Sequence, residues 1–473
     1  MKFTHDVIVI GAGAAGLTAA GGCAMFGLKA ALIERAEMGG ECLNNGCVPS
    51  KALITAAKRA AEANEYERFG IQMAAAKVNW TGVHAHIHEA IAHIAPHDSQ
   101  ERFEEMGCDV YRGHAHFTGP RTVEVDGVAL TAPKIVIATG SEPMVPPIEG
   151  LDSVPYLTNE NIWDLDQLPQ HLVIIGGGVI GMEMAQSFRR LGSEVTIIEP
   201  GELMGRDDPG SVAVVVEQMK AEGVMFVKGT AAKVTPGVLA SLSVTLEDGQ
   251  EVAGTHLLIA TGRKARTEGY GLEEIGVELG RNGIKVDARR RTNLKHIYAI
   301  GDCREGPRLT HVSGYEGSNV ALEITLGVPT KVDWSALPWC TYTDPEVAQI
   351  GMTEAQAREE LGDKVTVVRE GFDHNERAIA EGDTRGHLKV VMVGKKVLGA
   401  SIVGKNAGEM LLPFTQAITG KASTFAMGSA IIAYPTRSEI TKAAAFSAWE
   451  GTVFGSVPRG YARTRAWFRK TLR

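Results

Sequence analysis

A glycine-rich turn between a buried strand and a helix occurs twice in this chain, at residues 11–16 and 176–181. Both turns read G-x-G-x-x-G, and the strand after the helix ends on an acid, Glu34 in the first copy and Glu199 in the second. The acid lies 18 positions after the last glycine in both copies (16 to 34 and 181 to 199). A lone G-x-G-x-x-G is a weak signal, but this strand–turn–helix–strand context makes it a strong one. The matched copies indicate that one chain binds two dinucleotides.

The chemistry of a dinucleotide explains the pattern. Glycines permit a tight turn and let the backbone approach the pyrophosphate, whose charge faces the N-terminus of the helix. The acid can accept hydrogen bonds from the adenosine ribose hydroxyls. The cofactor-binding residues predicted in the two copies are Gly11, Gly13, Gly16 and Glu34, and Gly176, Gly178, Gly181 and Glu199.

Three shorter buried strands follow the turns, and each ends in a tight turn or a lone acid. They cover residues 135–138, 257–260 and 297–300, and they lead to Gly140, Gly262 and Asp302. A helix is expected to begin near Thr310 or His311.

A pair of cysteines, Cys42 and Cys47, lies just downstream of the first turn, and a helix is expected over 50–63. Cysteines with this spacing at the start of a helix can close a small disulfide ring, and the helix N-terminus favours the thiolate when the ring opens. The alternatives are two ordinary buried cysteines or half of a metal site. Zinc sites usually read C-x2-4-C with a second pair of ligands, and no second pair follows here. The spacing therefore favours a redox pair.

Length and composition favour a cytoplasmic multidomain enzyme. A chain of 473 residues exceeds what one hydrophobic core supports, so about two to four domains are expected. The net charge of −8 argues against nucleic acid as a partner. Six cysteines fit a reducing compartment rather than a secreted disulfide framework. The first residues enter a strand directly, unlike a signal peptide, and no apolar run approaches the ~20 residues of a membrane span.

The last part of the chain, from about Ala336, carries strand-like segments followed by helices and no dinucleotide turn. Its expected role is an interface or a cap. The final seventeen residues include Trp467 and Phe468 and six basic residues with no acid. The basic residues are Arg459, Arg463, Arg465, Arg469, Lys470 and Arg473. A solvated tail or a subunit contact is the main interpretation, and contact with an anionic membrane is the less expected alternative.

Residues 39–51 read G-G-x-C-x4-C-V-P-S-K, and this box lies between the two dinucleotide turns. Together with both A-T-G strands, the G-D element and the C-terminal part, it resembles the pyridine nucleotide–disulfide oxidoreductases. This family includes dihydrolipoamide dehydrogenase, glutathione reductase and mercuric reductase. The resemblance implies FAD and NADH or NADPH as cofactors, and a homodimer in which one subunit's interface domain completes the other's active site.

The resemblance also implies an α/β fold with two Rossmann-like dinucleotide-binding domains and a C-terminal α+β interface domain. The expected boundaries are 1–147 for the first part of the FAD domain, 148–268 for the NAD(P) domain, 269–335 for the return to the FAD domain and 336–473 for dimerisation.

Roles carry over from the family by position. The first turn and Glu34 would hold the FAD adenosine diphosphate, and Asp302 would bind the ribityl chain. The resemblance implies that Cys47 faces the flavin as a thiolate and that Cys42 attacks the substrate. Electrons would pass from NAD(P)H through the flavin to this pair. Further residues expected at the cofactors are Gly40, Lys51 with its ion-pair partner Glu183, Gly140, Gly262 and the helix at His311.

The chain departs from its disulfide-reducing relatives near the C-terminus. They carry H-P-T-x-x-E, whereas this chain places Tyr434 where the histidine stands and keeps the acid as Glu439. Tyrosine, with a pKa of ~10, is a poor base near neutrality, whereas histidine at ~6.5 is well placed to exchange a proton with a thiol. Hg(II) binds thiolates and needs no such proton. Two further departures are Glu41 and Asn45, where the family usually has Thr and Val.

The leading interpretation is therefore a mercuric-reductase-like enzyme whose substrate is a small or thiol-bound thiophilic metal. Against it, the last cysteine is Cys340, so the C-terminal cysteine pair of mercuric reductases is missing. Glu199 also favours NADH, whereas those enzymes generally use NADPH. A reductase of lipoamide or another small disulfide is the alternative. An electron-transfer or binding flavoprotein with a regulatory disulfide is the alternative of another class.

Histidines are frequent over residues 84–116. His84 with His88, and His93 with His97, have the spacing that could share a metal on one helix face. A polar helix face is the simpler interpretation, because no cysteine or H-E-x-x-H motif accompanies them. No metal site is assigned.

Overall fold

The computed structural model describes residues 2–63, 65–72, 76–238 and 241–471. The chain forms two compact units, Met1–Gly201 with Gly223–Val332, and Glu202–Glu222 with Asp333–Arg473. The first unit holds both glycine turns and the cysteine pair.

The first glycine turn belongs to a five-stranded parallel sheet in the order β19-β7-β1-β2-β3. Its strands are β1 (Val7–Ile10), β2 (Ala30–Glu34), β3 (Cys108–Arg112), β7 (Lys134–Ile137) and β19 (Ile297–Ala299). Val7 and Val9 face the helical side of the sheet, whereas Ile8 and Ile10 face the other side. Except for the edge strand β3, where Asp109 and Arg112 are exposed, the strands are apolar at nearly every position because both faces are covered.

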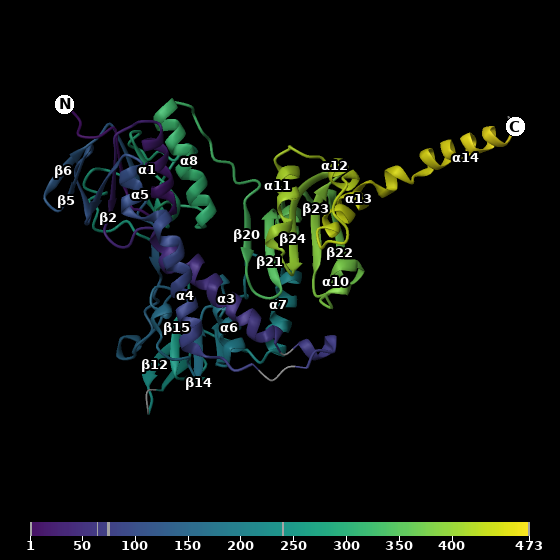
Figure 1. Ribbon diagram of the computed structural model, residues 1–473, viewed down its shortest axis with the longest axis horizontal. Helices are drawn as coiled ribbons and strands as arrows, with labels where there is room; N and C mark the ends of the chain where they lie inside the picture. The colour runs from purple at the N-terminus through teal and green to yellow at the C-terminus, as the bar shows by residue number, and fades with distance from the viewer. Residues whose placement is uncertain (1, 64, 73–75, 239–240, 472–473) are drawn as a thin grey trace. The chain divides into compact units, whose positions relative to one another are not determined.

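Different layers cover the two faces of this sheet. On one face lie α1 (Ala14–Met25) and α8 (Thr310–Leu326), which run side by side (Figure 1). On the other face lies an antiparallel meander, and its strands are β4 (Ala115–Gly119), β5 (Thr122–Val125) and β6 (Val128–Thr131). The glycine turn connects β1 to α1 at the carboxyl edge of the sheet, where ligands of such folds bind.

The second glycine turn lies in a four-stranded parallel sheet in the order β11-β10-β9-β15. The strands are β9 (His171–Ile175), β10 (Glu194–Glu199), β11 (Met225–Lys228) and β15 (His256–Ile259), and the helix after the turn is α6 (Val179–Leu191). A second meander joins the same hydrophobic core, with strands β12 (Ala231–Pro236), β13 (Leu242–Leu246) and β14 (Glu251–Gly254). The two parallel sheets confirm the predicted α/β class with two Rossmann-like modules.

A two-stranded ribbon connects the modules. β8 (Ser141–Pro143) leaves the first module and pairs antiparallel with β16 (Arg263–Ala265), which leaves the second. After a short hairpin of β17 (Leu279–Gly280) and β18 (Gly283–Ile284), the chain returns to the first sheet as β19. The residues that follow the two A-T-G segments are therefore neighbours in space.

The cysteine pair lies on two helices, α2 (Gly40–Asn44) and α3 (Cys47–Glu62). The helix expected over 50–63 thus begins three residues earlier, at Cys47. Pro49 does not prevent this, because a proline in the first helical turn lacks only an N–H that would have no intrahelical partner. Further along the first unit are α4 (Trp80–Ile94) and α5 (Gln100–Glu105).

The second unit is built on an antiparallel sheet in the order β20-β21-β24-β23-β22. Its strands are β20 (Pro338–Thr341), β21 (Glu346–Gly351), β22 (Val365–Gly371), β23 (His387–Val393) and β24 (Lys396–Gly404). Its helices are α7 (Pro209–Ala221), α9 (Glu354–Leu361), α10 (Glu376–Ala380), α11 (Leu412–Ile418), α12 (Thr424–Ser429), α13 (Glu439–Val453) and α14 (Ser456–Thr471). No helix in the described part of the chain is both long and apolar enough to cross a membrane.

Helix α7 joins this unit although it follows the second glycine turn in sequence. Asp208 caps its N-terminus and lies 2.5 Å from Nζ of Lys389, and both side chains are buried. The Ser211 hydroxyl lies 2.9 Å from that of Ser401 on β24. These buried polar contacts tie residues 202–222 to the antiparallel sheet.

Candidate functional site

The three glycines of the first turn serve two purposes. Gly11 has φ +105°, and a Cβ there would lie 2.3 Å from the Ala138 carbonyl oxygen. A Cβ on Gly16 would lie 1.7 Å from the Gly11 carbonyl oxygen. Gly13 differs, because a Cβ there would have only the Gly40 Cα, at 3.8 Å, within contact distance among the described atoms. Two glycines thus close the turn, and the middle one leaves space beside the backbone.

The second turn repeats this arrangement. Gly176 has φ +113° and lies against the Ala260 carbonyl, and Gly181 lies against the Gly176 carbonyl, at 2.4 Å and 2.0 Å for an added Cβ. No described atom lies within 4 Å of the position that a Cβ on Gly178 would take. Both turns therefore leave room for a pyrophosphate at the middle glycine, which fits the dinucleotides predicted for them.

The two acids make the same contacts in their modules. Glu34 accepts hydrogen bonds from the backbone N–H of Ala12 (2.6 Å) and of Ala36 (2.8 Å). Glu199 accepts hydrogen bonds from the N–H of Gly177 (2.6 Å) and of Gly201 (2.8 Å). A carboxylate has about four lone-pair positions, so each acid can still accept a ribose hydroxyl. Each carboxylate is thus fixed at the turn of its own copy.

A cavity of about 350 Å³ opens along the first turn. Its lining includes these predicted or singled-out residues: Gly11, Gly13, Glu34, Gly40, Glu41 and Gly140. Gly40 and Gly140 both have positive φ, +59° and +74°. The cavity thus combines the open middle glycine, the N-terminus of α1 and the ribose-accepting acid, which together fit the adenosine diphosphate part of FAD.

Three other predicted residues are not part of the cavity lining, although Asp302 contacts Ser141, which is. Gly262 has φ +128° and ends the A-T-G segment of the second module. His311 is exposed at the second position of α8. Asp302 stands before α8, and its Oδ2 accepts a hydrogen bond from the Ser141 hydroxyl at 2.8 Å.

The cysteine pair is electrostatically asymmetric. Cys47 is the first residue of α3, and Cys42 lies in the short helix before it. A hydrogen bond from the Cys42 thiol, the Thr310 hydroxyl and the nearby charge of Lys51 lower the pKa of Cys47 to about 6, although burial opposes this. The same hydrogen bond and burial raise the pKa of Cys42. At neutral pH, Cys47 is therefore the thiolate and Cys42 the thiol.

The partner of Cys47 outside the pair is Thr310, whose Oγ1 lies 3.2 Å from the Cys47 sulfur. Thr310 is the first residue of α8, so the N-termini of α3 and α8 both lie at this sulfur. Helix N-termini favour negative charge, which is the charge of a thiolate.

The predicted ion pair between Lys51 and Glu183 is present. Lys51 Nζ on α3 lies 2.9 Å from Glu183 Oε2 on α6, and the Glu183 side chain is only 4% exposed. The pair links the helix that carries Cys47 to the helix that follows the second glycine turn. Breaking a buried ion pair by removing one partner is costly, so the pair holds both helices in place at this point.

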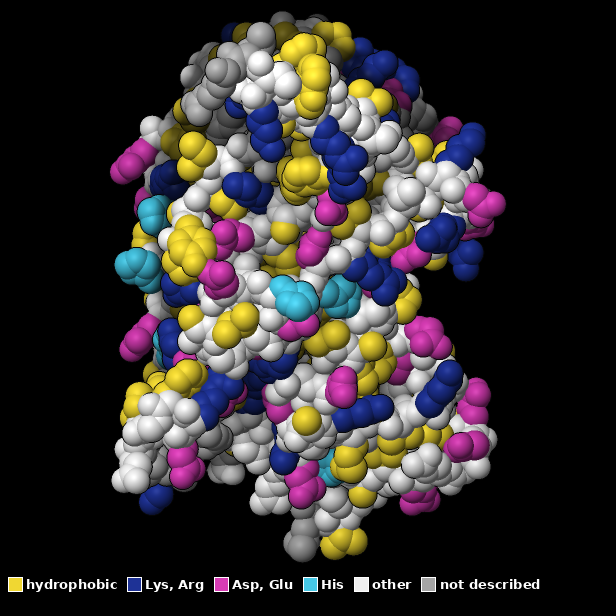
Figure 2. All heavy atoms as spheres, turned by 90° about the vertical axis from the view of Figure 1, so that its right-hand side faces the viewer, with side chains coloured by type: hydrophobic (Ala, Val, Ile, Leu, Met, Phe, Trp, Pro, Cys, Tyr) yellow, Lys and Arg dark blue, Asp and Glu magenta, His cyan; other side chains and the backbone are white. Residues whose placement is uncertain are grey.

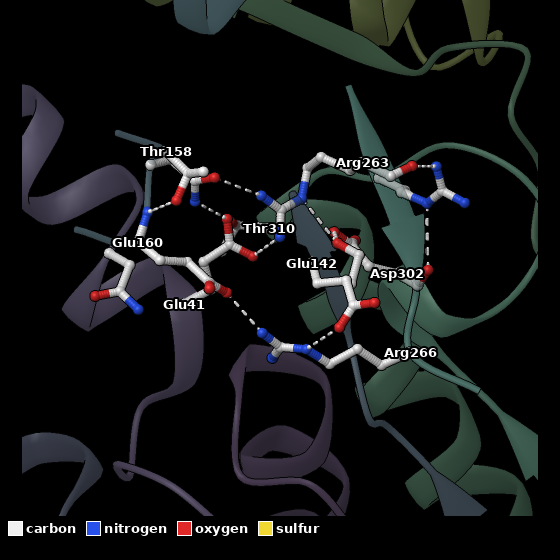
Figure 3. Close-up of polar contacts among 12 residues, drawn as sticks. Glu41, Glu142, Thr158, Glu160, Arg263, Arg266, Asp302 and Thr310 are labelled. Atoms are coloured by element: carbon white, nitrogen blue, oxygen red, sulfur yellow. Dashed lines mark hydrogen bonds and ion pairs between the residues drawn. The ribbon is translucent and has the colours of Figure 1, made fainter. Parts of the chain in front are cut away.

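Glu41, the residue before Cys42, lies in a polar network that the sequence did not predict (Figure 3). One of its carboxylate oxygens pairs with the Arg263 guanidinium, and the other accepts a hydrogen bond from the Asn159 amide at 2.9 Å. Burial raises the pKa of Glu41 to about 7, although Arg263 opposes the rise.

The network continues to Asp302. Arg263 Nε donates to the Ser141 hydroxyl at 2.8 Å, and that hydroxyl donates to Asp302. Arg266 belongs to the same group of polar residues, and its guanidinium donates to the Glu160 carboxylate at 2.6 Å (Figure 3). Ser141 and Arg263 each follow an A-T-G segment, so the duplicated segment was the available sequence signal for this contact.

Tyr434 has a different acidic partner from the one its motif indicates. Its hydroxyl donates to the carboxylate of Glu376 on α10, whereas Glu439 Oε2 accepts the backbone N–H of Thr436 at 3.3 Å. The hydrogen bond to Glu376 raises the pKa of Tyr434, because it stabilises the neutral phenol. Tyr434 is 70% exposed and lines a shallow cavity with Glu376, Glu439 and His374. Glu376 is thus a site residue that sequence reasoning missed.

The histidine-rich segment forms pairs rather than a cluster. The Nε2 atoms of His84 and His88 lie 3.1 Å apart on α4, and His88 also contacts the Trp163 carbonyl oxygen at 3.2 Å. His114 and His116 both contact the Gly269 carbonyl oxygen. Among the described residues, no group of three or more side chains is arranged to hold a metal ion.

Comparison with protein families identifies two matching models. The model described as pyridine nucleotide-disulphide oxidoreductase matches residues 5–317, and the model of the dimerisation domain of the same proteins matches residues 337–445. The second match places the antiparallel sheet in a dimerisation domain, and it supports the predicted homodimer.

Named relatives carry two activities. A mercuric reductase of Streptomyces lividans is 35% identical over 93% of this chain and 95% of its own length. A mercuric reductase of Lysinibacillus sphaericus is 34% identical over 94% of this chain and 82% of its own. A dihydrolipoyl dehydrogenase of Thermus scotoductus is 37% identical over 92% and 95%.

Among solved structures, the HOCl-induced flavoprotein disulfide reductase RclA from Escherichia coli is similar, with a TM-score of 0.84. It is 28% identical in sequence, and the likeness covers 93% of this chain and 99% of that one. A Cu(II) complex of the same protein is equally similar.

Proposed function

The chain belongs to the pyridine nucleotide–disulphide oxidoreductase family, and we propose that it uses Cys42 and Cys47 to reduce a thiophilic metal ion, Hg(II). Enzymes of this family bind FAD and take electrons from NAD(P)H. In the proposed reaction NAD(P)H and Hg(II) give NAD(P)⁺, Hg(0) and one proton. Two electrons leave the nicotinamide and two reach the metal.

The observation that carries the proposal is the Tyr434–Glu376 pair. A disulfide substrate yields two thiols, so at least one sulfur leaving group needs a proton from a group that titrates near neutrality. Tyr434 keeps its proton, because the Glu376 carboxylate accepts its hydrogen bond and raises its pKa. A metal held between two thiolates needs no protonated leaving group. Tyrosine in place of the family's histidine should therefore slow the reduction of disulfides and leave metal reduction possible.

The two cysteines have different protonation states and therefore different proposed roles. Cys47, with its pKa near 6, supplies a thiolate at neutral pH, and Cys42 holds the proton that must leave before it can bind a metal. Binding of Hg(II) releases that proton, and Cys42 regains one from the hydrogen that NAD(P)H delivers, so one proton leaves per turnover. Bound FAD would supply a two-electron carrier between NAD(P)H and this pair. The residues proposed to hold it are the first glycine turn, Glu34 and Asp302.

Lys51 and Glu183 are proposed as positioning residues for this chemistry. Their ion pair fixes Lys51 Nζ near the thiolate side of the pair, where its charge lowers the pKa of Cys47. Glu199 is proposed to set the nucleotide preference. Its carboxylate accepts a ribose hydroxyl and repels a 2′-phosphate, so NADH is the expected donor. A reduced thiol pair of this kind works in a reducing compartment, and we place the enzyme in the cytoplasm.

Anaerobic NADH consumption by the purified protein tests the substrate. Hg(II) with excess thiol, Cu(II), lipoamide and glutathione disulfide would be compared at equal concentration. The proposal predicts sustained turnover with Hg(II) and little with either disulfide. Cu(II) belongs in the panel because one of the similar solved structures is a Cu(II) complex.

A dihydrolipoyl-dehydrogenase-like activity is the second candidate. It is favoured by the 37% identity to the Thermus scotoductus enzyme and by the position of the last cysteine, Cys340. Mercuric reductases use a cysteine pair near the C-terminus to deliver metal, and this chain has none there. Turnover with lipoamide that exceeds turnover with Hg(II) would overturn the metal proposal in favour of this one.

A further inference from the structure

The last helix of the chain, α14, does not bury its apolar side chains against the rest of the described chain. It covers Ser456–Thr471, and none of its residues is buried. Within its own unit it extends away from the antiparallel sheet (Figure 1). The family model of the dimerisation domain ends at residue 445, so α14 lies beyond the matched domain.

The side chains of α14 divide into two faces. At about 100° per residue, one arc holds Val457, Tyr461, Trp467 and Phe468. These four side chains are 81%, 69%, 59% and 51% exposed. The opposite arc holds Arg459, Arg463, Arg465, Arg469 and Lys470. Arg473, which the sequence adds to this group, lies outside the described residues.

The positive charge of α14 contrasts with the negative net charge of the chain. The whole chain has a net charge of −8, whereas residues 456–471 contain five basic residues and no acid. In the upper part of Figure 2, Lys and Arg side chains are exposed beside hydrophobic ones. Large apolar side chains that stay exposed beside concentrated positive charge indicate a partner that is both anionic and apolar.

We propose that α14 lies on an anionic phospholipid surface, with its apolar arc among the acyl chains and its basic arc at the headgroups. Interfacial helices have this composition, with aromatic residues on one face and Lys or Arg on the other. Tyrosine and tryptophan suit the boundary, because each has an apolar body and a polar tip. Phe454, two residues before α14, is a further exposed aromatic side chain.

A lipid surface fits these observations better than a second copy of the chain. A second copy of this helix could cover the apolar arc, but it has no acid to pair with the basic arc. Nucleic acid would neutralise the charges but would leave the apolar arc in water. The proposal does not depend on which substrate the active site reduces.

Vesicle flotation of the full-length flavoprotein tests this proposal. The protein is mixed with vesicles of phosphatidylcholine alone or with added phosphatidylglycerol. Binding is expected only with phosphatidylglycerol, and it should weaken as salt is added, since salt screens the attraction. Equal binding to the two vesicle types, or none to either, would overturn the proposal.

A matched pair of variants separates insertion from simple attraction. Phe468→Glu and Ala466→Glu make the same change in charge, on the apolar and the basic arc respectively. Phe468→Glu should weaken binding to the vesicles at least about tenfold, because an aromatic side chain no longer enters the acyl region of the lipid. Ala466→Glu should weaken it about fivefold or less. Equal losses would refute insertion of the apolar arc.

Sedimentation of the same two variants tests whether α14 is instead a contact between subunits. Both should retain their flavin and remain dimers, because α14 buries nothing in its own chain. Dissociation of Phe468→Glu into monomers would show that α14 is a subunit contact and would overturn the proposal.

Discussion

The sulfur of Cys47 lies 3.2 Å from the hydroxyl oxygen of Thr310, a residue 263 positions further along the chain. This contact joins the first residues of α3 and α8, so two helix N-termini and one hydroxyl surround a single sulfur. All three favour negative charge there. The thiolate that the proposed chemistry needs is therefore a product of the fold as well as of the cysteine spacing.

Removal of the Thr310 hydroxyl should raise the pKa of Cys47. In the wild-type enzyme the thiolate should form as the pH rises through about 6. In Thr310→Ala the midpoint should move up by about one pH unit, because one hydrogen bond to the thiolate is lost. The ultraviolet absorbance of the thiolate in the reduced enzyme, followed against pH, measures this. Thr310→Ser keeps the hydroxyl and is the matched control; an unmoved midpoint in Thr310→Ala would contradict the assignment.

Glu41 should make the protein less stable as the pH rises. Its pKa rises from 4.5 to about 7 on folding, so between these values the folded state binds more protons than the unfolded state. Stability then falls with increasing pH across this window, by about 3 kcal/mol at most. Glu41→Gln removes this titration. The difference between the thermal midpoint of the variant and that of the wild type should therefore increase in favour of the variant from about pH 4.5 to 7. A constant difference across the window would show that Glu41 stays ionised in its pair with Arg263.

Replacement of Tyr434 by histidine should restore disulfide turnover. Histidine titrates near neutrality and, beside Glu376, could exchange a proton with a thiol. The expected gain in kcat with lipoamide is at least about tenfold, since a positioned acid–base group contributes 10²–10⁴-fold. Tyr434→Phe is the control and should not gain. If Tyr434→His reduces lipoamide no faster than the wild type, the tyrosine does not account for substrate choice.

Glu199 should make NADH the better donor. The ratio of kcat/KM for NADH to that for NADPH should exceed one in the wild type and fall in Glu199→Ala, because the carboxylate no longer repels the 2′-phosphate. Steady-state kinetics with the same acceptor give both values. A tenfold preference of the wild-type enzyme for NADPH would show this interpretation of Glu199 to be wrong.

Much of the fold could be predicted because its signals are local. The strands expected at 135–138, 257–260 and 297–300 have their bounds within one residue of expectation, since buried strand runs are recognised over short windows. The Lys51–Glu183 pair could be predicted only from family resemblance, because its members lie 132 positions apart. The start of α3 at Cys47 was missed because a proline normally signals a helix boundary.

What could not be predicted are contacts between distant residues that no motif links. Arg263 meets Glu41 only because β8 and β16 pair as a ribbon. Glu376 meets Tyr434 from a short helix that carries no recognisable motif. The sequence showed that α14 was basic and aromatic, but only the structure shows that its apolar side chains are all exposed.

The most direct test of the central claim uses Cys42→Ser in anaerobic assays with NADH and Hg(II). Cys42 is the proposed substrate-facing thiol, so Hg(II)-dependent turnover should fall at least about a hundredfold, as expected for loss of a nucleophile. Reduction of the bound flavin by NADH, followed by its visible absorbance, should persist, because that step does not use Cys42. Loss of turnover with intact flavin reduction would support a catalytic Cys42–Cys47 pair. Unchanged turnover would contradict it and would leave the pair a regulatory role.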